Sequence, residues 1–314
     1  IIEEIWLEEV VGKYIINYMK RAEMIKKAVP YILLAPLIAL LLILLLAVAN
    51  SLLQGLGYMP ALGLNKISLD YYREVFSNPE FSASLLLSLY ISLISTIFSV
   101  AIGVLICASL IKTKKAEKFY RNVLRIPILT PHIAVALFVV IIFSQSGILS
   151  RICYQLNIIN EINEFPNIIY NRKGIGIILG YIWKEAPFVA YFVLSFMESI
   201  SVIYEEAAIN LGASPIRSFF SVTLPLSMPA ILNAAFIILI FSFGAYELPF
   251  LLGVTKPKAL PVQAYVEYSH PDLRHRPYAM AENGVMILIS LVMAALYFYL
   301  WHKKLDGIRK SYDK

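Results

Sequence analysis

The 314-residue sequence has little charge. Asp, Glu, Lys and Arg together make up 15% of its residues, whereas about one quarter is typical of a soluble domain. Hydrophobic residues make up 59% and the mean hydropathy is +0.72. This composition excludes an ordinary soluble domain and indicates an integral membrane protein. The net charge of +6 does not indicate nucleic-acid binding, because the basic residues lie in short loops beside apolar runs.

Cysteine is also scarce, with two residues in the chain. Cys107 lies within an apolar run and Cys153 lies in a loop, so we expect the two to occupy different layers and form no disulfide. The spacings of Cys and His that hold structural zinc are missing. The sequence therefore predicts neither a disulfide framework nor a metal site.

Motifs of enzyme chemistry are missing as well. The sequence has no Walker A pattern, no HExxH, and no Ser/His/Asp arrangement with a sensible placement. Gly174, Gly176 and Gly180 do not have the G-x-G-x-x-G spacing, and no strand precedes them. Gly176 and Gly180 instead form a G-x-x-x-G pattern typical of close helix packing. We predict that the chain is not an enzyme and binds no cofactor of its own.

What the sequence has in abundance is long apolar segments. A spanning helix needs about 20 mostly apolar residues. Six segments qualify: 30–53, 84–111, 126–145, 174–197, 229–252 and 284–301. The predicted fold class is an all-α integral membrane protein with six transmembrane helices. Its expected parts are an N-terminal segment 1–29, a membrane domain 30–302 and a basic tail 303–314.

The distribution of Lys and Arg predicts the orientation. Segments 1–29, 112–125, 198–224 and 302–314 together carry 17 of them, whereas the loops 54–83, 146–173 and 253–283 carry nine. Because basic residues concentrate on the cytoplasmic side, we expect both termini in the cytoplasm. The loop 198–224 has a single Arg, but alternation of the spans places it on the same side.

The N-terminal region leaves two questions open. Ala47-Val48-Ala49 resembles a signal-peptide cleavage site, but the apolar run is too long for a typical signal, which favours an uncleaved helix. Residues 1–27 mix Glu with apolar side chains and end in basic residues. They are interpreted either as an amphipathic helix at the membrane surface or as a plain topogenic tail, with equal weight.

The loop 203–225 encodes a helical hairpin. Residues 203–211 are good helix formers, and Gly212 stands where a helix ends in a left-handed residue. Ser214 is suited to cap a second short helix that begins at Pro215. Leu224-Pro225 is expected to end that helix, and Pro229 to begin the next span. The side chains expected on the second helix are Arg217, Phe219 and Phe220.

This loop resembles the EAA loop of permease subunits of ATP-binding-cassette (ABC) importers. It has Glu206-Ala207-Ala208, then Gly212, then Val222 in place of the usual Ile, then Leu224-Pro225. The resemblance implies that residues 203–225 dock on a partner ATPase, which binds ATP and Mg²⁺. Exposed Phe219 and Phe220 would suit such an interface. The alternative is an ordinary cytoplasmic hairpin.

The resemblance extends over roughly residues 30–302. Segments 174–188, 243–253, 259–265 and 275–280 are similar to spermidine/putrescine-type permeases, the B-type subunit in particular. This resemblance implies the type I importer permease fold (MetI-like) and the bacterial inner or plasma membrane. It also implies two ATPase subunits, a second permease, more often a different chain, and an external binding protein. Relatives serve polyamines, thiamine, ferric iron and phosphonates, so the cargo stays open.

Ionisable residues at membrane depth usually face a cavity or a partner. Lys184 and Glu185 lie near the middle of the fourth predicted span, and Glu247 lies toward the outer end of the fifth. Our hypothesis is that Glu185, Tyr246 and Glu247 line or gate the translocation path, where carboxylates and an aromatic ring suit a polyamine-like cation. The alternative is that Lys184 and Glu185 bond to neighbouring helices and hold the bundle together.

Two further interpretations stay open. An ion- or proton-coupled secondary transporter would use Lys184, Glu185 and Glu247 as a relay, although the sequence has no evident internal repeat of the kind such transporters often show. His132 follows Pro127 and Pro131 at the start of the third span, which predicts an irregular helix start. A lone His there is more often a hydrogen-bonded structural residue than a proton relay.

Overall fold

The computed structural model describes the backbone of residues 2–110 and 117–312. Within these, side chains are described except at 2–25, 28, 117–118, 198–203, 205–206, 300 and 302–312. The described part of the chain is mostly helical and contains no β-strand, only an isolated bridge between Met59 and Leu64. It divides into two compact units, residues 1–53 and 54–314. These observations confirm the all-α class.

The first unit consists of the greater part of α1 (Ile2–Gly55), a single helix of 54 residues. Pro30 and Pro36 lie inside it. The span within α1 is Val29–Gly55. The side chains that would decide whether residues 1–27 are amphipathic, and the tail 303–314, lie outside the described residues.

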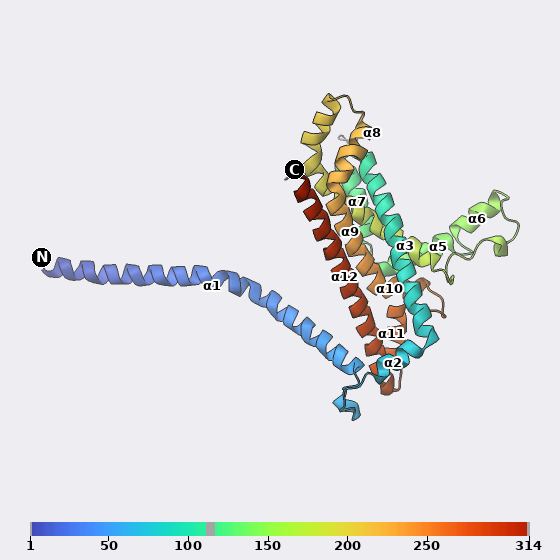
Figure 1. Ribbon diagram of the computed structural model, residues 1–314, viewed down its shortest axis with the longest axis horizontal. Helices are drawn as coiled ribbons and strands as arrows, with labels where there is room; N and C mark the ends of the chain where they lie inside the picture. The colour runs from blue at the N-terminus through green and yellow to red at the C-terminus, as the bar shows by residue number, and fades with distance from the viewer. Residues whose placement is uncertain (1, 111–116, 313–314) are drawn as a thin grey trace. The chain divides into compact units, whose positions relative to one another are not determined.

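The second unit is a bundle of long helices (Figure 1). Its principal members run side by side in the picture, with α8 at one end of the bundle and α2 and α11 at the other. The long helices are α3 (Pro79–Leu110), α7 (Ile175–Asn210), α9 (Leu224–Gly244) and α12 (Arg276–Tyr312). The shorter helices are α2 (Asp70–Ser77), α4 (Glu117–Leu129), α5 (His132–Phe143), α6 (Ile148–Gln155), α8 (Pro215–Ser218), α10 (Glu247–Leu252) and α11 (Leu260–Tyr268). Single turns are η1 (Pro60–Leu62), η3 (Ile162–Glu164), η4 (Phe219–Thr223) and η5 (Leu273–His275).

Helix α3 packs chiefly against α7, and its sequence explains why the two come close. Small residues recur every three or four positions along α3 and are buried: Ser84, Ser88, Ser92, Ser95, Ser99 and Gly103. A Cβ placed on Gly103 would lie 2.7 Å from Val189 Cγ1 and 3.0 Å from the Ala186 carbonyl oxygen. Small residues that let helix backbones approach are typical of membrane helix interfaces.

The core consists of three clusters of buried apolar side chains. One joins α3, α7 and α9 around Cys107, Val193 and Ala234. A second joins α5, α7 and α10 around Tyr181 and Leu248. The third lies between α2, α3, α11 and α12, and contains Val75, Phe81, Leu260, Ala281 and Val285. Neither cysteine forms a disulfide, and Cys107 is buried while Cys153 is half-buried.

Six helical segments are long and apolar enough to cross a membrane. They are Val29–Gly55, Pro79–Leu110, His132–Gln155, Ile175–Met197, Pro215–Gly244 and Leu273–Tyr299. The predicted number of spans is confirmed within the described residues, but the boundaries of the third, fifth and sixth spans were wrong. The third span begins at His132 rather than 126, because Pro131 interrupts the chain after α4. The fifth ends at Gly244 rather than 252, and α10 is a separate short helix.

The third wrong boundary is that of the sixth span, predicted to begin at residue 284. Helix α12 begins at Arg276, and the preceding segment, expected to be a loop, contains α11 and the turn η5. The charged residues between 272 and 282 lower the local hydropathy, so the hydropathy pattern alone did not predict the start of this helix. As a result, Glu282 lies within the helix and is buried.

Candidate functional site

The turn at Gly212 has the geometry that the sequence predicts. Gly212 has φ +89°, in the left-handed region. Its N–H donates to the carbonyl of Ile209 at 2.9 Å, and the N–H of Ala213 donates to that of Ala208 at 3.0 Å. This pair of bonds is the Schellman motif that ends a helix at a glycine. A Cβ at Gly212 would meet no atom within 4 Å, so the requirement for glycine is conformational.

The second half of the hairpin differs in part from the prediction. Ser214 caps α8 as expected, because its Oγ accepts a hydrogen bond from the N–H of Arg217 at 3.3 Å, and Pro215 is the first helical residue. Leu224-Pro225 does not end this helix, and that prediction was wrong. The π turn η4 joins α8 directly to α9, which begins at Leu224, so the helical run continues to Gly244. Pro225 is tolerated because it lies in the first turn of α9.

The exposure of the two phenylalanines was predicted correctly for one and wrongly for the other. Phe219 is 6% exposed and belongs to the core cluster with Val193 and Met197, because the π turn rotates it inward. Phe220 is 56% exposed. Leu211 and Ile216 are exposed beside the same turn, which the sequence analysis missed. The loop therefore exposes three large apolar side chains beside the turn, Leu211, Ile216 and Phe220.

The remaining predicted residues of the loop are distributed as follows. Ala207 and the side chain of Arg217 are exposed, and Ala208 is half-buried. Leu224 is partly buried against the core and Pro225 is exposed. The side chain of Glu206 lies outside the described residues.

Lys184 and Glu185 point to different partners, as expected for adjacent residues of a helix. The Lys184 ammonium donates to the carbonyls of Ile128 at 3.2 Å and Thr130 at 2.5 Å, where α4 ends. Those carbonyls lack intrahelical donors because the chain breaks at Pro131. Lys184 thus completes the irregular segment between α4 and α5, which agrees with the structural alternative for this residue.

Glu185 faces a cavity of about 180 Å³ between α7 and α9. Its side chain is 4% exposed, and Oε2 accepts a hydrogen bond from Ser99 Oγ at 3.5 Å. Oε1 is buried and has no hydrogen-bond partner among the described residues. The other lining residues are mostly apolar: Ile128, Lys184, Phe188, Ile237, Ile238 and Phe241. A buried polar atom without a partner requires an explanation, and an incoming donor group would supply one.

Glu247 does not line the cavity of Glu185. It contacts His132, which stacks on a residue of the cavity wall. Its Oε2 lies 2.7 Å from His132 Nδ1, and the His132 ring stacks on Phe241 with the centroids 5.5 Å apart. Phe241 lines the cavity that holds Glu185. His132 is therefore a bonded structural residue, as the sequence analysis favours, and Glu247 is connected to the cavity through two side chains.

Tyr246 lies elsewhere. Its ring packs against Tyr265 and Phe250, with centroids 4.6 and 5.0 Å apart. It lines a second cavity of about 390 Å³ between α9, α11 and α12. The structure places Tyr246 and Glu185 in different cavities, and the role of Tyr246 in the translocation path stays a prediction.

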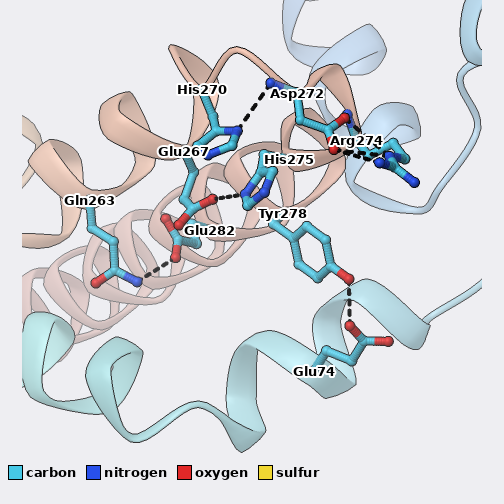
Figure 2. A network of polar contacts seen from close by, with 9 residues as sticks. All are labelled: Glu74, Gln263, Glu267, His270, Asp272, Arg274, His275, Tyr278 and Glu282. Carbon is cyan, nitrogen blue, oxygen red and sulfur yellow. Dashed lines mark hydrogen bonds and ion pairs between the residues drawn. The ribbon is translucent and has the colours of Figure 1, made fainter.

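A polar network at the α2 and α11 end was missed by the sequence analysis (Figure 2). It joins Glu74 to Tyr278, Glu267 to His275, and Gln263 to Glu282. The available signal was Glu282, a carboxylate between Ala281 and Gly284 in an otherwise small and apolar stretch. At the rim of this network Asp272 accepts hydrogen bonds from Arg274, which lower the pKa of its carboxyl group to about 2.

Comparison with known proteins gives a consistent family. Residues 99–304 match the family described as "Binding-protein-dependent transport system inner membrane component". The chain is 26% identical over 265 residues to the spermidine/putrescine transport system permease protein PotB of Haemophilus influenzae, covering 82% of this chain and 89% of that one. It is 25% identical to the trehalose transport system permease protein SugB of Mycobacterium tuberculosis, covering 80% and 91%.

Two further matches are limited: one relative is much longer than this chain, and one solved structure is similar in fold at low sequence identity. The ferric transport system permease protein FbpB of Actinobacillus pleuropneumoniae is 27% identical over 258 residues, but the chain spans 34% of its length. A chain of a bacterial ABC transporter that imports alginate has the same fold, with a TM-score of 0.74 at 21% identity, covering 90% of this chain and 98% of that one. The names of the matched relatives refer to polyamine, trehalose and ferric transport. The family match covers most of the chain and the spans are of the expected number, so this protein belongs to the binding-protein-dependent transport system inner membrane components and is a multi-pass permease of the ABC importer type.

Proposed function

We propose that the chain forms half of the translocation pathway of an ATP-driven importer and is coupled to its ATPase through the loop 203–225. It would assemble with a second, similar permease, two ATPase subunits that bind ATP and Mg²⁺, and an external binding protein. The observation that supports the coupling role is the exposure of three apolar side chains, Leu211, Ile216 and Phe220, on a hairpin with capped helix ends. Exposed aromatic and aliphatic side chains on such a projection are typical of protein interfaces.

The orientation is part of the proposal. The excess of Lys and Arg on segments 1–29, 112–125, 198–224 and 302–314 supports a cytoplasmic position for the hairpin and for both termini, in the plasma (inner) membrane. In that orientation the hairpin lies on the side where ATP is available. The α2 and α11 end of the bundle would then face outward, toward the binding protein.

The cargo we propose is a small organic cation of the polyamine type. The support is Glu185, whose buried Oε1 faces a cavity between two aromatic residues, Phe188 and Phe241. A carboxylate pairs with an ammonium group, and aromatic faces attract it. Glu247 would act as a gate, because its bond to His132 joins α10 to α5 beside the cavity wall.

A substitution at Gly212 tests the coupling role. Gly212→Asp places a side chain on a residue with φ +89° and adds a charge to the docking surface. We expect normal membrane levels of this chain but loss of ATPase association and of transport. The matched control is Gly63→Asp, because Gly63 also has positive φ (+75°) and open space around its Cβ, but follows the turn η1. Equal ATPase capture by both variants would show that the hairpin does not couple.

A separate substitution tests the cargo site. Glu185→Gln keeps the shape of the side chain and removes its charge. We expect ATPase association to persist and uptake of a polyamine such as putrescine to fall by about tenfold or more, since a hydrogen bond to a charged group is among the stronger ones. Unchanged uptake at equal membrane levels would remove Glu185 from the path.

A further inference from the structure

A pocket with three carboxylates in its lining lies at the α2 and α11 end of the bundle. It shares no lining residue with the cavity of Glu185. It has a volume of about 390 Å³ and is lined from three helices, α2, α11 and α12, together with the short turns beside them. Its lining residues are Glu74, Val75, Asn78, Glu267, His275, Tyr278 and Glu282. Figure 2 shows five of these side chains, Glu74, Glu267, His275, Tyr278 and Glu282.

Glu282 is the deepest acidic group of the pocket. It is 3% exposed, and its Oε1 accepts a hydrogen bond from Gln263 Nε2 at 2.6 Å. Its Oε2 is buried and has no partner within the described part of the structure. A carboxylate oxygen that is out of contact with water and without a donor is costly. A hydrogen-bond donor that enters the pocket would satisfy this oxygen.

Two other polar side chains of the wall are already engaged. The Tyr278 hydroxyl donates to Glu74 Oε2 at 2.5 Å, and His275 Nδ1 lies 2.7 Å from Glu267 Oε2. Three carboxylates thus share the lining with one histidine as the potential cation. Like charges gathered in one site disfavour ionisation of each other unless a positive group enters.

Three basic side chains near the pocket have other contacts, whereas Lys258 acts electrostatically on Glu282. Lys256 pairs with Glu80 at 3.1 Å, and Arg274 pairs with Asp272 at 2.8 Å. The Arg276 guanidinium lies over the ring of Tyr268, 5.1 Å from its centroid. None of these three cations donates a hydrogen bond to Glu282 Oε2 among the described residues.

The spacing of the carboxylates decides between two kinds of cation. A metal ion requires several ligands at 2.0–2.6 Å from one point, roughly. Among the residues that the structure describes, no three His, Cys, Asp or Glu side chains come together closely enough to hold a metal ion. Carboxylates spread around a larger cavity suit a cation whose charge is carried on hydrogen-bond donors. A primary ammonium group has three such donors.

We propose that the pocket formed by Glu74, Glu267 and Glu282 binds a small organic cation through a primary ammonium group, which donates to Glu282 Oε2. The volume lies near the lower end of the range for small-molecule sites, about 300–1,000 Å³, so a molecule of a few carbon atoms fits. The site is separate from the cavity of Glu185. It does not depend on the proposed transport function, since binding here requires neither ATP nor a partner subunit.

The test is calorimetric titration of the purified full chain in lipid nanodiscs, in the Glu185→Gln background so that the cavity of Glu185 does not contribute. Butan-1-amine, protonated at pH 7, is the probe, and butan-1-ol is its neutral counterpart of nearly equal size. Empty nanodiscs correct for partition into lipid. We expect saturable binding of the amine, no saturable binding of the alcohol, and weakening by about tenfold or more in Glu282→Gln.

The variants separate loss of the site from loss of the fold. Glu267→Gln also removes a charge from the lining and, because Glu267 is only half-buried, does not depend on tolerance of a buried change. Glu164→Gln makes the same chemical change in the turn η3, away from the pocket, and should bind the amine like the parent. Equal amine affinity in all three variants, or no saturable binding by the parent, would overturn the proposal.

Discussion

His132 Nδ1 lies 2.7 Å from Glu247 Oε2, so the first residue of α5 is bonded to the first residue of α10. The His132 ring also stacks on Phe241, which forms part of the wall of the cavity that holds Glu185. A change at Glu247 can therefore reach the cavity through His132 and Phe241 without direct contact. This relationship separates two roles that a transport assay alone would confuse, contact with cargo and support of the cavity wall.

The first prediction concerns this pair. The variants His132→Gln and Glu247→Gln should each lower the free energy of unfolding. The loss in the double variant should be smaller than the sum of the two single losses by about 0.5–1 kcal/mol. This coupling is small because more than half of the Glu247 side chain is exposed and water weakens the bond. Denaturant unfolding of the purified chain measures the cycle. Strict additivity would show that the two residues act independently. Transport that is lost in Glu247→Gln but retained in His132→Gln would instead favour direct contact of Glu247 with cargo.

The second prediction concerns the exposed surface of the hairpin. Phe220→Ala should reduce capture of the partner ATPase by about tenfold, because an exposed aromatic residue in a docked surface is a frequent hot spot. Phe76→Ala is the matched control. Phe76 is exposed to nearly the same extent (57% against 56%) and its ring also meets a neighbouring phenylalanine edge-on. Similar capture by both variants would argue that Phe220 is not in the interface.

The third prediction concerns the contact of α3 with α7. Gly103→Ala places a Cβ 2.7–2.8 Å from Val189, so one helix must shift. We expect a loss of about 1–3 kcal/mol in the free energy of unfolding, the usual cost of overpacking. Gly244→Ala is the control, because a Cβ there meets nothing within 4 Å and φ is not positive. Equal stability of the two variants would contradict the close packing of these helices.

The sequence was sufficient for the fold and for the loop because their determinants are local. Apolar length defines the spans, and Gly212, Ser214 and Pro215 each act on their own turn. The wrong or missed predictions concern features that depend on tertiary contacts. The π turn that buries Phe219 and the break at Gly244 that frees α10 depend on packing against α7. Glu282 was missed because charged neighbours hid the start of α12, and its burial follows from contacts with α11.

The last prediction concerns pH. Arg274 donates hydrogen bonds to Asp272, and the pKa of the Asp272 carboxyl group is lowered from 3.8 to about 2. A carboxyl group with a lowered pKa stabilises the fold above its unfolded pKa, and that contribution is lost as pH falls through the folded value. Asp272 should therefore add nothing to any change between pH 5 and pH 8. Carbon-13 chemical shifts of labelled aspartate should show one carboxyl group titrating near pH 2, moved to about 3.8 by Arg274→Gln. A midpoint near 3.8 in the parent chain would show that the Asp272–Arg274 contact does not persist.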